Sequence, residues 1–461
     1  MSTDQEARVS IPWGTLAVSI VLTAVPLAAF LRGDVHTRVL VLAVALLAIG
    51  AYAATVHPVS IFVGLAVVVG CLPYIHIAGT TIPLLLVLAV ATWVALPFVP
   101  GVRLRPGRCE VWVVALAVIA FVSVAMSDFS KAALIELAAW LVATAVVIPV
   151  RFLPRDARTT MVRAFVTATA AASAFGIAVL RLDPNGEFLS KHVNFAGYEE
   201  GQVHLHQVPG SGTLTTRLTS TYVEPNIAGL VLAAGVVLAV AYFRGYLRVV
   251  LAILIGAALL LTLSRAALGT LVVAGLLVVL RSSGRRRWTA LGLVAAAGLA
   301  VVAVPRVRVR LIDSFGPSDT GAKDRLQALQ EFSQVMADHW TWGLGWARPE
   351  FRDAALNRAL NFVANAPLLT IYRGGLVLGG LVVLVLVVLV VRSWITARRS
   401  FQDAVVCCTV MAFVLVALQL DFPVVTQPPA TVILSMLVGL SMHRDERQPD
   451  PPRATTLTTD S

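Results

Sequence analysis

The chain has 461 residues, of which 58% are hydrophobic and only 13% are charged, whereas soluble domains carry about 25% charged residues. This composition excludes an ordinary soluble domain of that length. The net charge of +11 does not indicate nucleic-acid binding, because the basic residues form short clusters between apolar runs instead of one continuous stripe.

Apolar runs of roughly 20 residues, the length that crosses a bilayer core, recur along most of the chain. They predict an all-α polytopic membrane protein with about 14 transmembrane helices, 12 to 14 being compatible with the pattern. The first run is interpreted as a retained span and not as a cleaved signal peptide. The predicted spans are residues 11–31, 39–56, 58–77, 80–99, 110–126, 132–150, 160–180, 225–243, 247–262, 265–280, 288–305, 367–391, 403–420 and 429–442.

The orientation follows from arginine clusters, since basic residues in short loops stay in the cytoplasm. If the N-terminus is inside, the even-numbered spans end at such clusters throughout the later part of the chain, so both termini are predicted to be cytoplasmic. The predicted organisation is a cytoplasmic N-terminus (1–10), N-terminal spans (11–180), a first external loop (181–224), central spans (225–305), a second, partly helical external loop (306–366), C-terminal spans (367–442) and a disordered cytoplasmic tail (443–461).

Three arginines in or beside the two external loops are the candidate functional residues. Arg265 lies in a short turn between two apolar spans, with no acidic neighbour in sequence. A charge near membrane depth is costly unless it has a partner, so Arg265 either snorkels to the interface or binds an anionic group. A guanidinium matches phosphate oxygens with a bidentate fork. We therefore group Arg217, Arg265 and Arg325 as a candidate anion site.

Other features of the loops allow alternative readings. Glu224-Pro225-Asn226 enters a span, where proline suits the first helical turn. Trp342 and Trp346 flank a glycine-containing turn, and anchoring at the membrane interface is one interpretation of them.

The motifs of common soluble enzymes are missing from the sequence, which contains no GxGxxG after a strand, no P-loop, no HExxH and no GxSxG. His204 and His206 could contact a metal, but the loop offers no third ligand with them, so neither a metal nor a cofactor is expected. Cys71, Cys109, Cys407 and Cys408 form neither a disulfide framework nor a CxxC site.

Residues 210–390 resemble the O-antigen ligase and O-antigen polymerase family. The resemblance rests on four segments: Arg217 to Ala228 with its Pro-Asn entry into a helix, the Ser264-Arg265 turn, Asp324-Arg325 followed by Trp342-Gly343-Leu344-Gly345-Trp346, and Asn361 to Gly375. It implies a membrane-embedded glycosyltransferase that moves a polyprenyl-diphosphate-linked glycan to an acceptor hydroxyl at the outer face of the cytoplasmic (inner) membrane. It also implies that Arg217, Arg265 and Arg325 are catalytic and that Asn226, Asn365, His204 and His206 contact substrate.

The sequence departs from that family at one position. Where its ligases usually place a histidine, this chain has Ala364 before Asn365. The general base is therefore open, with His204, His206, Asp313 and Asp319 as candidates, or the reaction depends on arginine electrostatics alone. The departure favours a polymerase over a ligase.

Two other functions remain open at this stage. A transporter or flippase for a lipid-linked or polar substrate also needs many spans, although the chain has no convincing internal repeat. A scaffold in a cell-envelope complex is the third possibility. The expected partners are the lipid bilayer and the lipid-linked glycan, with no nucleic acid. The sequence leaves open the sugar, the acceptor, the linkage, the oligomeric state and whether a chain-length or export partner takes part.

Overall fold

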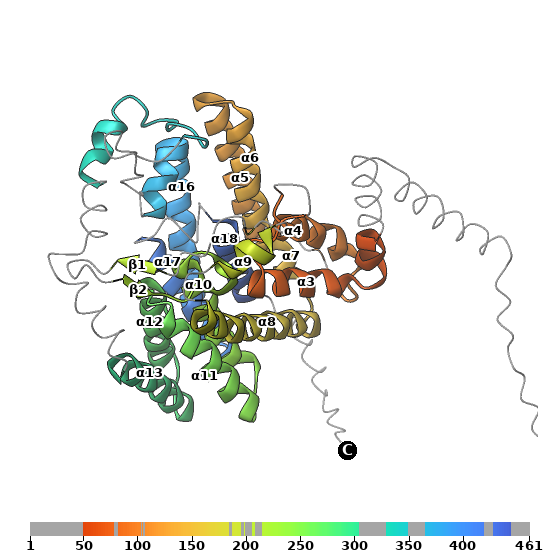
Figure 1. Cartoon of the computed structure of the whole chain (residues 1–461). Helices are drawn as coiled ribbons and strands as arrows, with labels where there is room; N and C mark the ends of the chain where they lie inside the picture. The colour runs from red at the N-terminus through yellow and green to blue at the C-terminus, as the bar shows by residue number, and fades with distance from the viewer. Residues whose placement is uncertain are drawn as a thin grey trace, which may run out of the picture.

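A computed structural model describes residues 49–77, 82–102, 104, 107–183, 187–194, 198, 205–207, 214–303, 329–348, 365–418 and 427–443. These residues form a helical bundle with one small antiparallel sheet, in which β1 (Leu205–Gln207) pairs with β2 (Leu214–Thr216) (Figure 1). The predicted predominantly α-helical class is confirmed.

The helices begin and end close to the predicted spans from residue 58 onward. They are α3 (Pro58–Cys71), α4 (Leu84–Ala95), η1 (Leu96–Phe98), α5 (Arg108–Ser127), α6 (Lys131–Ala145), α7 (Val147–Phe152), α8 (Arg155–Leu182), α9 (Phe188–His192), η3 (Ser220–Tyr222), α10 (Pro225–Tyr242), α11 (Gly245–Leu261), α12 (Arg265–Arg281), α13 (Arg285–Ala303), α16 (Ala366–Thr396), α17 (Phe401–Ala417) and α18 (Pro428–Ser441).

Among the described residues, five helical stretches are long and apolar enough to cross a membrane by themselves. They are Arg108–Ser127, Lys131–Phe152, Arg155–Leu182, Pro225–Tyr242 and Ala366–Thr396. Four shorter apolar helices are Leu84–Phe98, Gly245–Leu261, Phe401–Ala417 and Pro428–Ser441. The chain is therefore a multi-pass membrane protein, while the count of about 14 spans is not confirmed.

The first described helices differ from the prediction of two separate spans. Ile49–Val56 and α3 meet at His57 with a bend of 116°, and only together do they satisfy the length and hydropathy of a span. Pro58 begins α3, and a proline at this position has no N–H to continue the preceding helix. The pair is thus one broken span or a re-entrant element. Residues 11–31 lie outside the described part of the chain.

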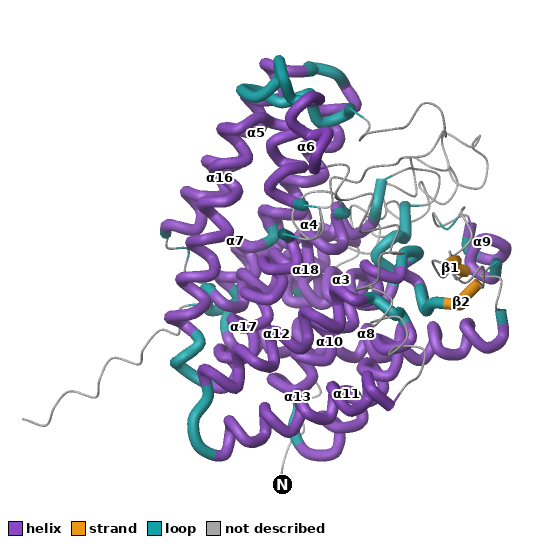
Figure 2. The backbone as a smooth tube through the Cα atoms, turned by 90° about the vertical axis from the view of Figure 1, so that its left-hand side faces the viewer, coloured by secondary structure: helices purple, strands orange, loops and turns teal. Residues whose placement is uncertain are grey.

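Helix α10 forms the centre of the bundle (Figures 1 and 2). Of the 18 residues of α10, 89% are buried, against 22% of the most apolar stretch of α5. It packs against α8, α11, α12 and α17. Small residues such as Gly229, Ala233 and Gly235 let these neighbours approach closely, as is usual where helices pack inside a membrane.

Arg281, which the sequence assigns to the cytoplasm, contacts the C-terminal part of α16. An Nη atom of Arg281, at the end of α12, donates to the carbonyl of Trp394 at 2.9 Å, and its guanidinium lies 4.2 Å from the centre of that ring. Nearby in the chain, Gln402 Nε2 donates to the carbonyl of Ala241, 3.0 Å away at the end of α10.

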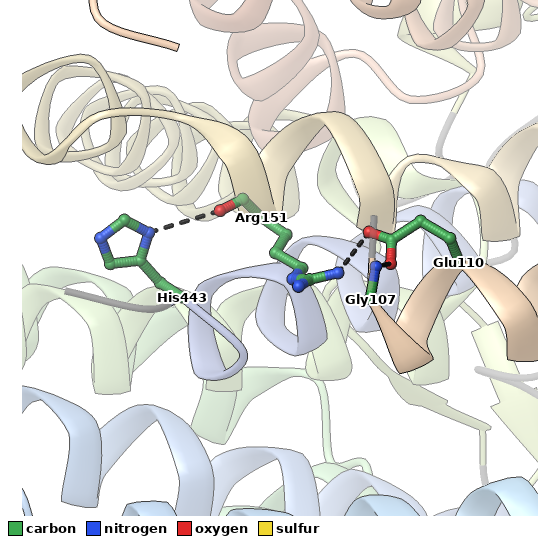
Figure 3. Close-up of polar contacts among 4 residues, drawn as sticks. All are labelled: Gly107, Glu110, Arg151 and His443. Atoms are coloured by element: carbon green, nitrogen blue, oxygen red, sulfur yellow. Dashed lines mark hydrogen bonds and ion pairs between the residues drawn. The ribbon is translucent and has the colours of Figure 1, made fainter. Parts of the chain in front are cut away.

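A second group of contacts joins the start of α5, the end of α7 and the end of α18 (Figure 3). Arg151 forms an ion pair with Glu110, whose other oxygen accepts from the backbone N–H of Gly107 at 2.7 Å. His443 Nδ1 lies 3.3 Å from the backbone carbonyl of Arg151. We call the side of the bundle that carries Arg151, Arg281 and Trp394 the basic end.

Candidate functional site

The candidate site is built where α10 and α12 begin. Ser264, which directly precedes α12, donates from Oγ to Asn226 Oδ1 in the first turn of α10, 3.1 Å away. One turn further along α10, a Cβ on Gly229 would lie 2.6 Å from the Cβ of Ala267. The missing side chain at Gly229 therefore lets the two helix N-termini meet.

Arg217 reaches this junction from the sheet, because it directly follows β2. The backbone N–H of Leu218 donates to the carbonyl of Leu261 at 2.9 Å, which docks the segment on the end of α11. Arg217 Nε then donates to the carbonyl of Thr262 at 2.8 Å, and its Nη2 donates to Asn226 Oδ1 at 3.3 Å. With 7% of its surface exposed, Arg217 is a buried cation held by hydrogen bonds.

Asn226 connects three other side chains at this point. Its Oδ1 accepts from Arg217 and Ser264, while its Nδ2 donates to Glu224 Oε1 at 3.0 Å. A guanidinium can only donate and a carboxylate can only accept, so the chemistry of the neighbours fixes which way the amide points. Asn226 consequently holds Arg217, Glu224 and Ser264 in one arrangement.

Unusual backbone conformations surround the same junction. Three non-glycine residues in the described part of the chain have positive φ, namely Ser220 at 53°, Val223 at 62° and Leu263 at 51°. Such conformations cost on the order of 1–3 kcal/mol each, and for a β-branched residue like Val223 they are rare. All three flank Arg217, Asn226 or Ser264 in sequence. Strain of this kind concentrates at functional sites.

Hydrogen bonds from inside the bundle hold the strained segment. Tyr222 donates its hydroxyl to the carbonyl of Gly70, and Tyr198 donates to the carbonyl of Thr221 at 3.0 Å. Ser220 Oγ donates to a carbonyl of α8 at 2.6 Å. Burial raises the pKa of Tyr198 and of Tyr222 above the ordinary tyrosine value, so both hydroxyls stay protonated donors. The end of the predicted first external loop therefore lies inside the bundle.

Arg265 is the first residue of α12 and is half-buried. A cation at a helix N-terminus is unfavourable by itself, because that end of the helix already carries partial positive charge. The N-cap residues of both α10 and α12, Glu224 and Ser264, make no side-chain capping bond to their own helix. The N-termini of α10 and α12 therefore meet beside the buried Arg217, and Arg265 is the residue with which α12 begins there. Helix N-termini and guanidinium groups both favour an anion.

A third arginine, Arg373, lies beside a break in α16. Gly375 has φ of 76° inside this helix, and a Cβ there would lie 2.0 Å from the carbonyl oxygen of Thr341. The turn around Thr341 takes over backbone hydrogen bonds at the break: Leu376 N–H donates to the carbonyl of Trp340 at 2.7 Å, and Leu344 N–H donates to the carbonyl of Tyr372 at 2.7 Å. The short loop and the broken helix thus form one unit.

Trp346 and Arg373 lie in this unit. Trp346 is 1% exposed, and the guanidinium carbon of Arg373 lies 5.6 Å from the centre of its ring. Trp140 of α6 packs against Trp346 with ring centres 5.1 Å apart. Trp346 is therefore a core residue, which rules out for this tryptophan the interpretation as an interface anchor.

The predicted site residues have different outcomes. Arg217 and Asn226 are hydrogen-bonded to each other, and Arg265 follows Ser264, which donates to Asn226. Asn365 caps α16, with Oδ1 accepting from Leu368 N–H at 3.1 Å, and its Nδ2 donates to the carbonyl of Leu418 at 2.9 Å. The backbone of His206 pairs with Thr215 in the sheet. The positions outside the described residues are His204, Asp313, Asp319, Arg325 and Ala364.

Sequence reasoning missed two charged groups that the structure brings into view. The sequence indicates Glu224 only as the residue before the first turn of a helix, yet its carboxylate accepts a hydrogen bond from Asn226. Arg373 was not singled out, although an arginine before Gly374-Gly375 in an apolar run is a signal of a broken helix with a buried charge. Among the described residues, no group of three or more His, Cys, Asp or Glu side chains is arranged to hold a metal ion.

Part of the chain matches a known protein family. The family model described as O-antigen ligase matches residues 249–377. The matched region contains Thr262, Ser264, Arg265 and Arg373, while Arg217 and Asn226 precede it. No curated protein matches the chain.

Proposed function

We propose that this membrane protein transfers a polyprenyl-diphosphate-linked oligosaccharide to an acceptor hydroxyl in the synthesis of cell-surface polysaccharide, because residues 249–377 match the family model described as O-antigen ligase. The family implies a lipid-linked glycan as substrate. The diphosphate, the acceptor hydroxyl and the choice of a polymerase over a ligase are our proposal, the last because of Ala364.

The observation that carries the proposal is the buried Arg217 at the junction of two adjoining helix N-termini, one of which begins with Arg265. A diphosphate leaving group gains negative charge as its bond to the sugar breaks. Fixed guanidinium groups and helix N–H groups stabilise that charge without reorganising, which is the electrostatic contribution that such a transfer needs. Asn226 and Thr262 hold Arg217 in place before substrate arrives.

The proposed reaction exchanges one bond at the anomeric carbon. The acceptor oxygen forms a new glycosidic bond to this carbon while the bond from the carbon to the diphosphate oxygen breaks, with inversion. Both electrons of the broken bond leave with the polyprenyl diphosphate. The proton of the acceptor hydroxyl passes to a carboxylate and then to solvent.

We assign that carboxylate to Glu224. It is half-buried and lies one amide away from Arg217, since Asn226 donates to it and accepts from the arginine. In its deprotonated form this carboxylate can accept the proton of an acceptor hydroxyl that binds beside it. Glu224 would thus supply the base for which the family's ligases use a histidine, replaced here by Ala364.

The position of the candidate site in the bundle supports a reaction outside the cytoplasm. The starts of α10 and α12 lie at the opposite ends of these helices from Ala241 and Arg281, which belong to the basic end. Because basic ends face the cytoplasm, we place the site at the outer face of the inner membrane and both termini in the cytoplasm. An export or chain-length partner remains a further proposal.

The test is transfer of a lipid-linked repeat by the purified chain in liposomes. Arg265→Ala and Arg217→Ala are expected to lower the rate by about 10²–10³-fold, as loss of one oxyanion donor does. The control is Arg244→Ala, an exposed arginine at the start of α11 that should retain activity. Normal products from both site variants would overturn the proposal. Translocation of the lipid-linked substrate without any glycan product would instead favour a transporter.

A further inference from the structure

An apolar cavity lies away from the arginine site. A cavity of about 100 Å³ sits between α5, α6, α7, α16 and α18, and it is partly open to the outside of the bundle. Its walls are almost entirely apolar, with Trp112, Trp140, Leu386 and Val438 among them. A water molecule needs only about 10–15 Å³, and a large apolar cavity binds apolar ligands in preference to water.

The cavity begins at the basic end of the bundle. Cys109 and Trp112 belong to the first turns of α5, while Leu389 and Met442 lie near the C-terminal ends of α16 and α18. Along α18 the lining runs from Met442 back to Thr431, which is about 16 Å at 1.5 Å per residue. This depth is about half of the roughly 30 Å hydrocarbon core, the depth of one leaflet.

Positive charge surrounds the end of the cavity. Arg108 precedes Cys109 and is exposed, and Arg155 is exposed four residues after Arg151. Of the acids at this end, Glu110 is already paired with Arg151 (Figure 3). Asp156, exposed beside Arg155, is the other acid in this part of the sequence.

The other charged groups near this end of the cavity do not make its net charge negative. His443 follows Met442 and contacts the backbone carbonyl of Arg151, and Arg158 on α8 adds another cation. The described residues at the cavity end therefore carry an excess of positive charge.

One hydroxyl in the cavity wall also needs a partner. Thr144 lines the cavity, and its Oγ1 is buried with no hydrogen-bond partner among the described residues. Buried hydroxyls are nearly always hydrogen-bonded. An ester oxygen at the top of a lipid chain would satisfy it.

We infer that this cavity binds one acyl chain of an anionic phospholipid from the leaflet at the basic end, with the headgroup phosphate against Arg108 and Arg155. Apolar walls suit the chain, and the excess positive charge selects an anionic over a zwitterionic headgroup. The lipid site is separate from the candidate transfer site, which begins at the opposite ends of the helices.

Brominated lipids test this inference, because bromine on an acyl chain quenches tryptophan in contact with it. The full chain is reconstituted with brominated phosphatidylglycerol or brominated phosphatidylcholine of identical chains, and the contribution of Trp112 is taken as the difference from Trp112→Phe. Quenching of Trp112 is expected at about a tenfold lower fraction of the anionic lipid.

Two variants separate the cavity from the charge. Ser435→Phe fills the cavity and should remove the Trp112 quenching, whereas Val114→Phe on the exposed face of α5 should not. Arg108→Gln with Arg155→Gln leaves the core untouched and should abolish the preference for phosphatidylglycerol, while Arg244→Gln with Arg287→Gln, at other exposed basic positions, should preserve it.

Three results would overturn the inference: equal quenching by both lipids in the unaltered chain, a preference that survives the Arg108 and Arg155 changes, or displacement of the brominated lipid by polyprenyl phosphate and not by phosphatidylglycerol. If Ser435→Phe fails to fold, the two charge-pair variants still decide the outcome.

Discussion

Asn226 and Ser264 are 38 residues apart in sequence and are joined by a hydrogen bond of 3.1 Å that links the starts of α10 and α12. The same Asn226 oxygen accepts from Arg217. One amide therefore sets the position of the buried arginine relative to the turn that carries Arg265.

This relationship predicts that Asn226 positions Arg217 for the transfer. Asn226→Ala removes the hydrogen bond to the guanidinium, and a hydrogen bond to a charged group contributes about 1.5–3 kcal/mol. We expect kcat to fall roughly 10- to 100-fold with a smaller change in KM.

A double-mutant cycle checks the positioning role. In a chain that already carries Arg217→Ala, adding Asn226→Ala should lower kcat little further, because the guanidinium that Asn226 holds is already absent. Additive losses in the double variant would show that Asn226 acts independently of Arg217.

The close approach at Gly229 leads to a second prediction. A Cβ at Gly229 would lie 2.6 Å from Ala267 and 2.9 Å from the Cβ of Ser264, so Gly229→Ala must push α10 and α12 apart. We expect a stability loss of about 1–3 kcal/mol and weaker glycan transfer. Thermal unfolding in detergent measures the first effect.

Gly269→Ala is the matched control for this change. Gly269 lies on the same helix as Arg265, is exposed, and has nothing within 4 Å of its added Cβ. This variant should be unchanged or more stable by up to about 1 kcal/mol, since alanine is the better helix former. Equal effects of the two substitutions would contradict the role of the α10–α12 contact.

Much of the fold was predictable from the sequence because apolar runs and their breaks report directly on membrane helices. The predicted span 225–243, for example, corresponds to α10 at Pro225–Tyr242. Proline at the first turn also marks this start correctly. The path of the chain through residues 39–77 was harder to predict, because hydropathy does not reveal that a break at His57 bends the helix by 116°.

The candidate site was predictable only in part. The motif resemblance pointed to Arg217, Arg265 and Asn226, but their arrangement depends on contacts between distant residues. Polar character suggested that residues up to Glu224 lie in an external loop, whereas Leu218 and Tyr222 are fully buried. Hydropathy cannot detect this, since hydroxyl groups of the segment are satisfied by donating to backbone carbonyls of other helices.

Glu224 provides a third prediction, on pH. Glu224→Gln keeps an oxygen that can accept from Asn226 Nδ2 but removes the charge and the proton acceptor. If Glu224 is the general base, it must be deprotonated to work, so the rate of the unaltered chain falls as the pH is lowered. The variant should be slower by about 10²–10⁴-fold and should lose this acidic limb.

The measurement is a pH profile of kcat/KM with a lipid-linked repeat as substrate. Glu187→Gln serves as the control, because this exposed carboxylate pairs with Lys191 away from the arginine site. An unchanged acidic limb in Glu224→Gln would assign the base to another residue.

The break in α16 leads to the last prediction. Gly375→Ala places a Cβ on a residue with φ of 76° and directly against the carbonyl of Thr341, so the turn that carries Trp346 must move. Because Trp346 contacts both Trp140 and Arg373, we expect altered tryptophan fluorescence and a lower unfolding temperature, with a cost of at least about 1–3 kcal/mol. Gly380→Ala, on an exposed part of the same helix with nothing within 4 Å, should change neither. If Gly375→Ala behaves like Gly380→Ala, the loop and the broken helix do not form one unit, and Arg373 is held by other contacts.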